Sequence, residues 1–285
     1  MKPCILLQTD FSLAWSAVAS MKGVIKIVDP ALDVQDICHE IKNFDPWEAS
    51  MSLNTVEPYW PKGSIFVSVV DPGVGTERKA SVALLNDGNY VVTPDNGTLT
   101  HLFHRVGVKE IREIDETVNR YRAQEEVSVF HGRDIFAYCA ARLASGCITF
   151  EQVGREYPVE KIVICEEYHK RPVLGNRSAN GFIQSGLKHF GGIQINITNE
   201  EWKQCGFRLG DIVHTTITHN GRTVFENDIL YHEAFGCVEK SEPILYCGSS
   251  RYLCLDCNMD NFMRKYGIES GKEWEIAFAV RKMQL

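Results

Sequence analysis

The first half of the chain alternates between short apolar runs and segments in which apolar residues recur with helical spacing. The apolar runs lie at 5–8, 25–28, 33–37, 65–70, 80–85 and 90–93, and the helical spacing covers 13–25, 46–56, 98–104 and 133–145. A continuous run such as 65–70, rich in β-branched residues, is typical of a strand buried on both faces. Strands that alternate with helices predict an α/β domain, a mainly parallel sheet with flanking helices.

The pattern changes near Glu167. Residues 169–180 are polar, contain Pro172 and Gly175, and show no periodicity, which predicts a linker. Short strand-like runs follow at 181–185, 192–198, 211–218, 222–225, 243–246, 252–255 and 274–280, with helical spacing only over 259–266. We therefore expect three parts: an α/β domain over 1–168, a linker over 169–180, and a smaller all-β sandwich or barrel over 181–285.

Composition narrows the class of protein. The 285 residues are 44% hydrophobic and 24% charged, which is typical of a globular protein with one large or two moderate domains. The net charge of −7 argues against nucleic acid or an anionic membrane as a general partner. The first apolar run ends at Asp10, and no run is long enough to cross a bilayer. We expect a cytoplasmic protein.

The ten cysteines do not indicate a metal site or a disulfide scaffold. They are scattered from Cys4 to Cys257, and only Cys254 and Cys257 have the two-residue spacing of metal or redox pairs. These two lie in an apparent strand over 251–257, where side chains three apart point to opposite faces. His101 and His104 have no nearby carboxylate with ligand spacing. We expect reduced cysteines, no metal and no cofactor.

Two aspartates follow predicted strands of the α/β domain. Asp10 comes after the first strand and Asp71 after the run at 65–70, at the carboxyl ends where ligands bind in such sheets. A carboxylate at Asp10 could accept both hydroxyls of a ribose. Each residue also has a structural interpretation, because Asp10 could cap the next helix and Asp71 could bond its own turn.

The segments 70–78 and 130–134 set ionisable groups beside glycines, where a backbone can approach a ligand closely. Together Asp71, Arg78 and His131 supply an acid, a guanidinium and an imidazole, a set that could bind and polarise water without a metal. Taken singly, Arg78 could form a surface ion pair and His131 could be a core histidine. The residues alone thus indicate an α/β enzyme or a nucleoside-binding protein.

A series of short motifs extends this interpretation because they occur in one order. The chain resembles the S-adenosylmethionine (SAM) hydroxide adenosyltransferase family, which is related to fluorinating and chlorinating enzymes that attack the same substrate. The motifs are Thr9-Asp10-Phe11, Met21-Lys22-Gly23, His39-Glu40-Ile41, Asp71-Pro72-Gly73-Val74-Gly75-Thr76, Arg78, Pro94-Asp95-Asn96-Gly97 and Phe130-His131-Gly132-Arg133-Asp134. The resemblance is strong in the N-terminal half and weaker beyond it.

The resemblance implies a homotrimer with active sites between subunits, and hydrolysis of SAM to adenosine and methionine by attack at the ribose C5′. It implies that Asp71, Arg78 and His131 activate the water and that Asp10 holds the ribose hydroxyls. The substrate-binding residues that it implies besides Asp10 are Trp47, Phe130, Gly132, Phe190, Phe235, Ser249 and Asn258. The resemblance implies no metal ligands, and it implies that SAM is the substrate rather than a cofactor.

Departures from the family pattern leave alternatives open. The Asp…Phe-Gly-Asn motif, which in the family contacts the methionine part, is replaced by 187–192, where the carboxylate and the asparagine are both absent. The adenine-side segment 249–258 lacks the usual Arg-Asn or Val-Asn ending. A different 5′-substituted adenosine, or a non-catalytic adenosyl-ligand binder, therefore remains possible. Halide as the nucleophile is disfavoured because 78–94 has no room for the extra loop of fluorinating members.

Overall fold

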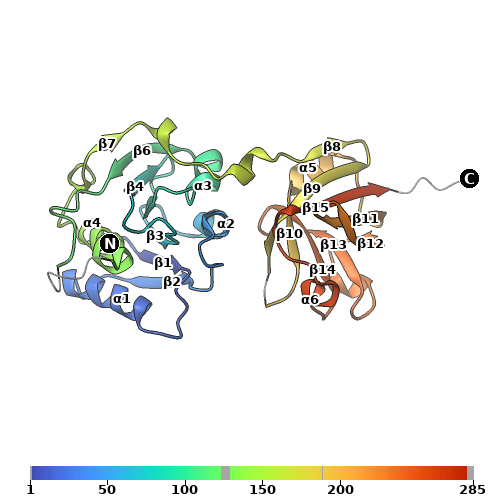
Figure 1. Ribbon diagram of the computed structural model, residues 1–285, viewed down its shortest axis with the longest axis horizontal. Helices are drawn as coiled ribbons and strands as arrows, with labels where there is room; N and C mark the ends of the chain where they lie inside the picture. The colour runs from blue at the N-terminus through green and yellow to red at the C-terminus, as the bar shows by residue number, and fades with distance from the viewer. Residues whose placement is uncertain (1, 123–128, 188, 281–285) are drawn as a thin grey trace, which may run out of the picture. The chain divides into compact units, whose positions relative to one another are not determined.

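The computed structural model describes residues 2–122, 129–187 and 189–280. The chain divides into two compact units, Met1–Tyr168 and His169–Leu285 (Figure 1). Each unit has its own sheet and its own hydrophobic core. The units are therefore described one at a time.

The first unit is built on a seven-stranded sheet with the order β2-β1-β3-β5-β4-β6-β7 (Figure 1). The strands are β1 (Ile5–Thr9), β2 (Val34–Cys38), β3 (Ile65–Val69), β4 (Ala80–Leu85), β5 (Tyr90–Pro94), β6 (Val108–Glu113) and β7 (Glu156–Tyr157). The helices are α1 (Ala17–Val28), α2 (Pro46–Val56), α3 (Thr100–Arg105) and α4 (Tyr138–Ser145), and a π-helical turn (Gly132–Ala137) leads directly into α4.

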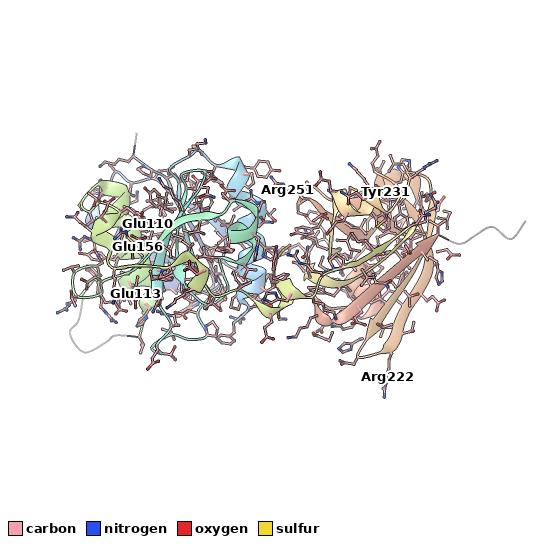
Figure 2. All side chains as sticks on the ribbon, turned by 90° about the horizontal axis from the view of Figure 1, so that it is seen from above. Glu110, Glu113, Glu156, Arg222, Tyr231 and Arg251 are labelled. Carbon is pink, nitrogen blue, oxygen red and sulfur yellow. The ribbon has the colours of Figure 1, made fainter. Side chains whose placement is uncertain are left out.

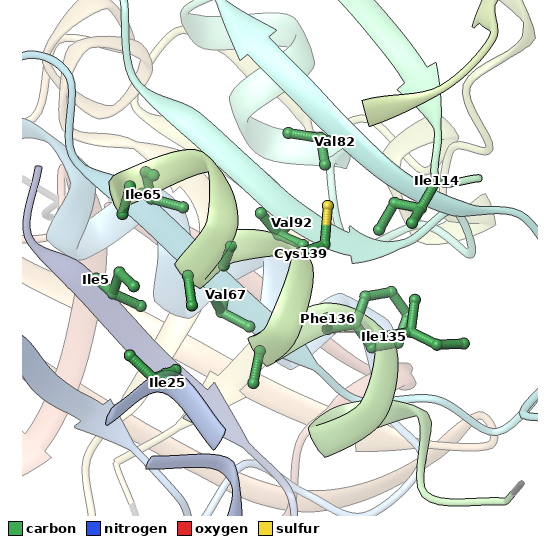
Figure 3. Close-up of a cluster of buried hydrophobic side chains, with 14 of the residues drawn as sticks. Ile5, Ile25, Ile65, Val67, Val82, Val92, Ile114, Ile135, Phe136 and Cys139 are labelled. Carbon is green, nitrogen blue, oxygen red and sulfur yellow. The ribbon is translucent and has the colours of Figure 1, made fainter. Parts of the chain in front are cut away.

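Both faces of this sheet are buried, as continuous apolar strands predict. Ile5 and Leu7 of β1 pack into one core with α1 and α4, whereas Leu6 between them packs into the opposite core. Figure 3 shows the first core, in which Val82 and Val92 of the sheet lie beneath the helical side chains. Because successive side chains of a strand point to opposite faces, each strand contributes residues to both cores.

The sheet is mixed, so the prediction of a mainly parallel sheet was wrong. β2, β1, β3 and β5 run parallel, but β4 is antiparallel to β5 and β6, and β6 is antiparallel to β7. The cause is the tight connection at Asp87 and Gly88, where Gly88 has a φ of 98°. A turn this short joins antiparallel neighbours, whereas a parallel pair needs a long crossover.

The second unit is a closed β-barrel. In the order β10-β14-β13-β12-β11-β15-β9, a further pairing between β9 and β10 completes the circle, and β8 extends the sheet from β9. The strands are β8 (Val173–Gly175), β9 (Ser178–Gly186), β10 (Ile193–Thr198), β11 (Ile212–His219), β12 (Arg222–Tyr231), β13 (Pro243–Cys247), β14 (Tyr252–Cys257) and β15 (Gly271–Val280). The core holds residues such as Trp202, Phe262 and Phe278.

Two expectations for this half need correction. The segment 169–180 contains β8 and the start of β9, because their backbones pair across a tight turn at 176–177 despite the polar side chains. A helix also exists besides α6 (Phe262–Tyr266), namely α5 (Asn199–Gln204). Its start is fixed by a capping box, in which Thr198 and Glu201 bond each other's backbone N–H.

Surface side chains of the first unit form ion pairs at the β6–β7 edge. Arg112 binds Glu110 and Glu156, which lie close together in Figure 2. Across residues 2–122, 129–187 and 189–280, no helix is both long and apolar enough to span a membrane.

Candidate active site

Asp71 lies just beyond the carboxyl end of β3, where the chain leaves the sheet. The backbone N–H of Val74 bonds the carbonyl of Asp71, so the residue opens a turn as well as presenting its carboxylate. Gly73 lies against Arg78, since a Cβ at position 73 would be 3.1 Å from Cγ of that arginine. The turn therefore packs directly against the Arg78 side chain, which extends back toward Asp71.

Arg78 joins the other two residues of the predicted triad. Its Nε donates to both carboxylate oxygens of Asp71, at 3.0 and 2.9 Å, and its Nη2 lies 2.8 Å from Nδ1 of His131. The side chains of Arg78 and Asp71 are only 9% and 6% exposed, so this ion pair is largely shielded from water. The guanidinium also lies 5.3 Å from the ring centroid of Phe136. The structure thus brings Asp71, Arg78 and His131 together.

The contact with Arg78 determines the tautomer of His131. A guanidinium only donates hydrogen bonds, so Nδ1 of the imidazole accepts and the neutral ring carries its proton on Nε2. Burial lowers the pKa of His131 below its ordinary value, and the positive charge of Arg78 lowers it further. The site therefore favours a neutral histidine that presents an N–H group.

Phe130 and Gly132 flank this histidine. A Cβ at Gly132 would lie 3.0 Å from the ring of Phe130 and 3.1 Å from the ring of Phe11. The two rings are tilted against each other, with centroids 5.7 Å apart. A side chain at position 132 would displace this aromatic pair, which explains the glycine.

Asp10 lies near the triad and does not cap a helix. Its Oδ2 accepts the backbone N–H of Phe44 at 3.0 Å, whereas α1 begins after Ser16. Burial raises the pKa of the Asp10 carboxyl, and the negative charge of Asp71 adds to the rise. The predicted Trp47 is buried in the first turn of α2, with its ring 4.3 Å from that of His101. Whether either residue contacts a ligand stays a prediction.

The remaining charged pair of this motif is structural. Arg133 donates from Nε to the buried carboxylate of Asp134 at 2.6 Å. Asp134 lies in the first turn of the π-helical segment, where negative charge is favoured. This pair holds the segment that carries His131.

Three predicted residues of the second unit line one cavity. Phe190, Phe235 and Asn258 surround a hollow of about 730 Å³ on the outside of the barrel. Phe190 is 79% exposed, which is unusual for a phenylalanine and leaves its ring available for contact. Ser249 does not line this cavity and is exposed in the turn before β14. The structure therefore groups three of the four residues predicted in this unit.

Sequence reasoning missed other residues of that cavity, above all Asp256, with Tyr246 and Arg264. One sequence signal could have pointed to Asp256, because it is the only charged residue in the strand Tyr252–Cys257. Among the residues that the structure describes, no group of three or more His, Cys, Asp or Glu side chains has the geometry to hold a metal ion.

Comparison with known proteins identifies the family. Residues 5–154 match the model of the SAM hydroxide adenosyltransferase N-terminal domain, and residues 188–275 match the model of its C-terminal domain. Together these two matches span most of both units.

Individual relatives agree with this result. The chain is 32% identical to the (R)-S-adenosyl-L-methionine hydrolase of Methanocaldococcus jannaschii, over 96% of this chain and 95% of that protein. It is 25% identical to a fluorinase of Nocardia brasiliensis, over 95% of each. The crystal structure of an uncharacterized conserved protein from Thermotoga maritima superposes with a TM-score of 0.86 at 32% identity, over 96% of this chain and 99% of the other. This protein is therefore a member of the SAM hydroxide adenosyltransferase family.

Proposed function

We propose that this protein hydrolyses SAM to adenosine and methionine, with water attacking the ribose C5′. The observation that carries the proposal is the buried contact of Arg78 with both Asp71 and His131. A protein that only binds an adenosyl ligand has no need of such a set. The family, and the SAM hydrolase name of the 32% identical relative from Methanocaldococcus jannaschii, support the same reaction.

The reaction needs little beyond an oriented water. The water oxygen forms a bond to C5′ while the C5′–S bond breaks and its electron pair goes to sulfur. The positive sulfonium thereby leaves as the neutral thioether of methionine, and one proton of the water is released. The barrier is lowered mainly by alignment opposite the sulfur and by partial removal of the water from bulk solvent.

The three side chains divide this work between them. His131 presents Nε2–H, which orients the attacking oxygen as its hydrogen-bond acceptor. Arg78 stabilises the negative charge that develops on that oxygen as its proton departs. Since Nδ1 of His131 is occupied by Arg78, Asp71 is the acceptor for the departing proton.

The residues around the triad would hold the nucleoside. Asp10 accepts hydrogen bonds from the ribose hydroxyls, and Trp47 and Phe130 contact the sugar. The adenine and methionine parts of the substrate are contacted by residues of the second unit, namely Phe190, Phe235, Ser249 and Asn258. In our proposal a homotrimer assembles active sites between subunits, and the water and the substrate are all that the reaction requires.

Adenosine release from purified protein tests the proposal. Both sulfonium epimers of SAM are supplied, and adenosine is measured by chromatography with and without a chelator. We expect chelator-independent adenosine formation that Arg78→Ala and His131→Ala slow by roughly 100-fold or more. Arg222→Ala is the matched control, because this arginine lies exposed at the tip of the β11–β12 hairpin (Figure 2).

Adenosine formation no faster than without protein would refute the proposal. The same assay with added fluoride or chloride tests the halide alternative. In this protein β4 and β5 are joined by a tight turn, which supports water over halide. We expect no 5′-halogenated adenosine at any halide concentration that leaves the protein folded.

A further inference from the structure

Asp256 occupies an unusual place on the barrel. Leu253, Leu255 and Cys257 of β14 point into the barrel core, so Asp256 between them points outward. An outward aspartate is normally hydrated, yet Asp256 is only 5% exposed. It lines the cavity that also contains Phe190 and Phe235.

The carboxylate of Asp256 is poorly satisfied by the protein. Its Oδ1 accepts the backbone N–H of Cys257 at 2.8 Å. Oδ2 has no hydrogen-bond partner within the described part of the chain. Burial raises the pKa of Asp256 to about 6, which reflects the cost of keeping this charge from water. Because Asp256 lines the cavity, a ligand bound there could donate a hydrogen bond to this carboxylate.

Gly192 makes the space that this carboxylate fills. Ile193 pairs with Leu255, so Gly192, which directly precedes β10, lies beside Asp256 of β14. A Cβ at position 192 would be 2.4 Å from Oδ2 and 2.7 Å from Cγ of Asp256. The aspartate therefore occupies the volume of any side chain at 192, which is the position where the family pattern has its asparagine.

The cavity suits part of a small organic molecule. Its volume of about 730 Å³ lies within the usual range of ligand pockets. The rings of Phe235 and Tyr246 lie 5.0 Å apart on its wall, and the exposed ring of Phe190 offers a surface for stacking. A carboxylate among aromatic rings selects for a group that donates hydrogen bonds from nitrogen.

We propose that Asp256 is a specificity-determining residue, whose carboxylate accepts a hydrogen bond from an amino group of the substrate. This inference rests on the proposed function and deepens it. Gly192 and Asp256 together restore an acceptor in a motif that has lost its aspartate and its asparagine. SAM carries two candidate groups, the exocyclic amine of adenine and the α-ammonium of methionine.

Binding measurements that need no turnover test this role. The probes are S-adenosyl-L-homocysteine, which has both amino groups, and adenosine, which has only the exocyclic amine. Calorimetry is run on full-length protein, on Asp256→Ala and on Asp256→Asn, with Asp228→Asn on β12 as a control outside the cavity. Asp256→Ala should weaken S-adenosyl-L-homocysteine binding by roughly 10- to 100-fold, and Asp256→Asn, which retains an acceptor oxygen, by less.

The two probes distinguish the two amino groups. Equal weakening for adenosine assigns Asp256 to the adenine amine, and unchanged adenosine binding with weakened S-adenosyl-L-homocysteine binding assigns it to the α-ammonium. Wild-type affinity of Asp256→Ala for both probes would overturn the inference, as would no binding of either probe to the wild-type protein. Failure of SAM hydrolysis alone would refute the proposed reaction and leave these binding results interpretable.

Discussion

Replacing Gly192 by alanine should destabilise the barrel through one identified clash. The backbone at Gly192 is outside the left-handed region, so alanine brings no conformational penalty. Its Cβ would lie 2.4 Å from Oδ2 of Asp256, far closer than such atoms approach in folded proteins. Gly192 is buried and bordered by β10, which limits relaxation. Overpacking of this kind costs about 1–3 kcal/mol in the free energy of unfolding.

A double-mutant cycle isolates this clash. In the Asp256→Ala background the nearest remaining atom is the Cβ of residue 256, at 3.2 Å, which needs a shift of only a few tenths of an ångström. Gly192→Ala should then cost less than about 1 kcal/mol, so the coupling is roughly 1–2 kcal/mol. Urea unfolding followed by fluorescence of Trp202 and Trp274, both buried in the barrel, measures each variant. An equal cost of Gly192→Ala in both backgrounds would refute the reasoning.

Three further predictions concern the two sites. Arg78→Lys should lower kcat for adenosine release by roughly 100-fold, because one ammonium cannot reproduce the paired contacts to Asp71 and His131; near-normal turnover would contradict the proposed role. The neutral form of His131 is required and its pKa is lowered, so kcat/KM should be level above pH 6.5 and fall only at lower pH, and an inflection above that value would contradict the assignment. Burial raises the pKa of Asp256 from 3.8 to about 6, so stability gained below pH 3.8 is lost as pH rises through 6. At pH 8, Asp256→Asn should therefore exceed wild type by at most about 3 kcal/mol in the free energy of unfolding, seen as a higher unfolding temperature. The difference should vanish in acid, and equal unfolding at pH 8 would argue against burial of the charge.

Local sequence signals located much of the fold. The predicted helix over 46–56 matches α2, because Pro46 begins the helix and Asp45 caps it through the N–H of Glu48. The predicted strand over 80–85 matches β4. The mainly parallel sheet was wrongly predicted, because the apolar pattern of a buried strand is the same in both directions.

Contacts between distant segments explain what the sequence could not show. Asp71 and Arg78 share one turn, but the 2.8 Å contact of Arg78 with His131 spans 53 residues and only the order of motifs indicated it. The neighbourhood of Gly192 and Asp256 depends on the register between β10 and β14. No periodicity within either strand specifies that register, so Asp256 could not be selected as a site residue.

The π-helical turn between His131 and α4 lets the direction of His131 and the packing of α4 be set separately. An α-helix turns by about 100° per residue, so a continuous helix would tie the direction of His131 to the packing of Cys139 and Ala140. The wider turn, Gly132–Ala137, accommodates one extra residue, so the direction of His131 no longer depends on the packing of α4. Shortening this turn by one residue would disrupt either the packing of α4 in the core or the contact between the His131 imidazole and the Arg78 guanidinium. The fold and the candidate chemistry can thus vary independently on either side of a single turn.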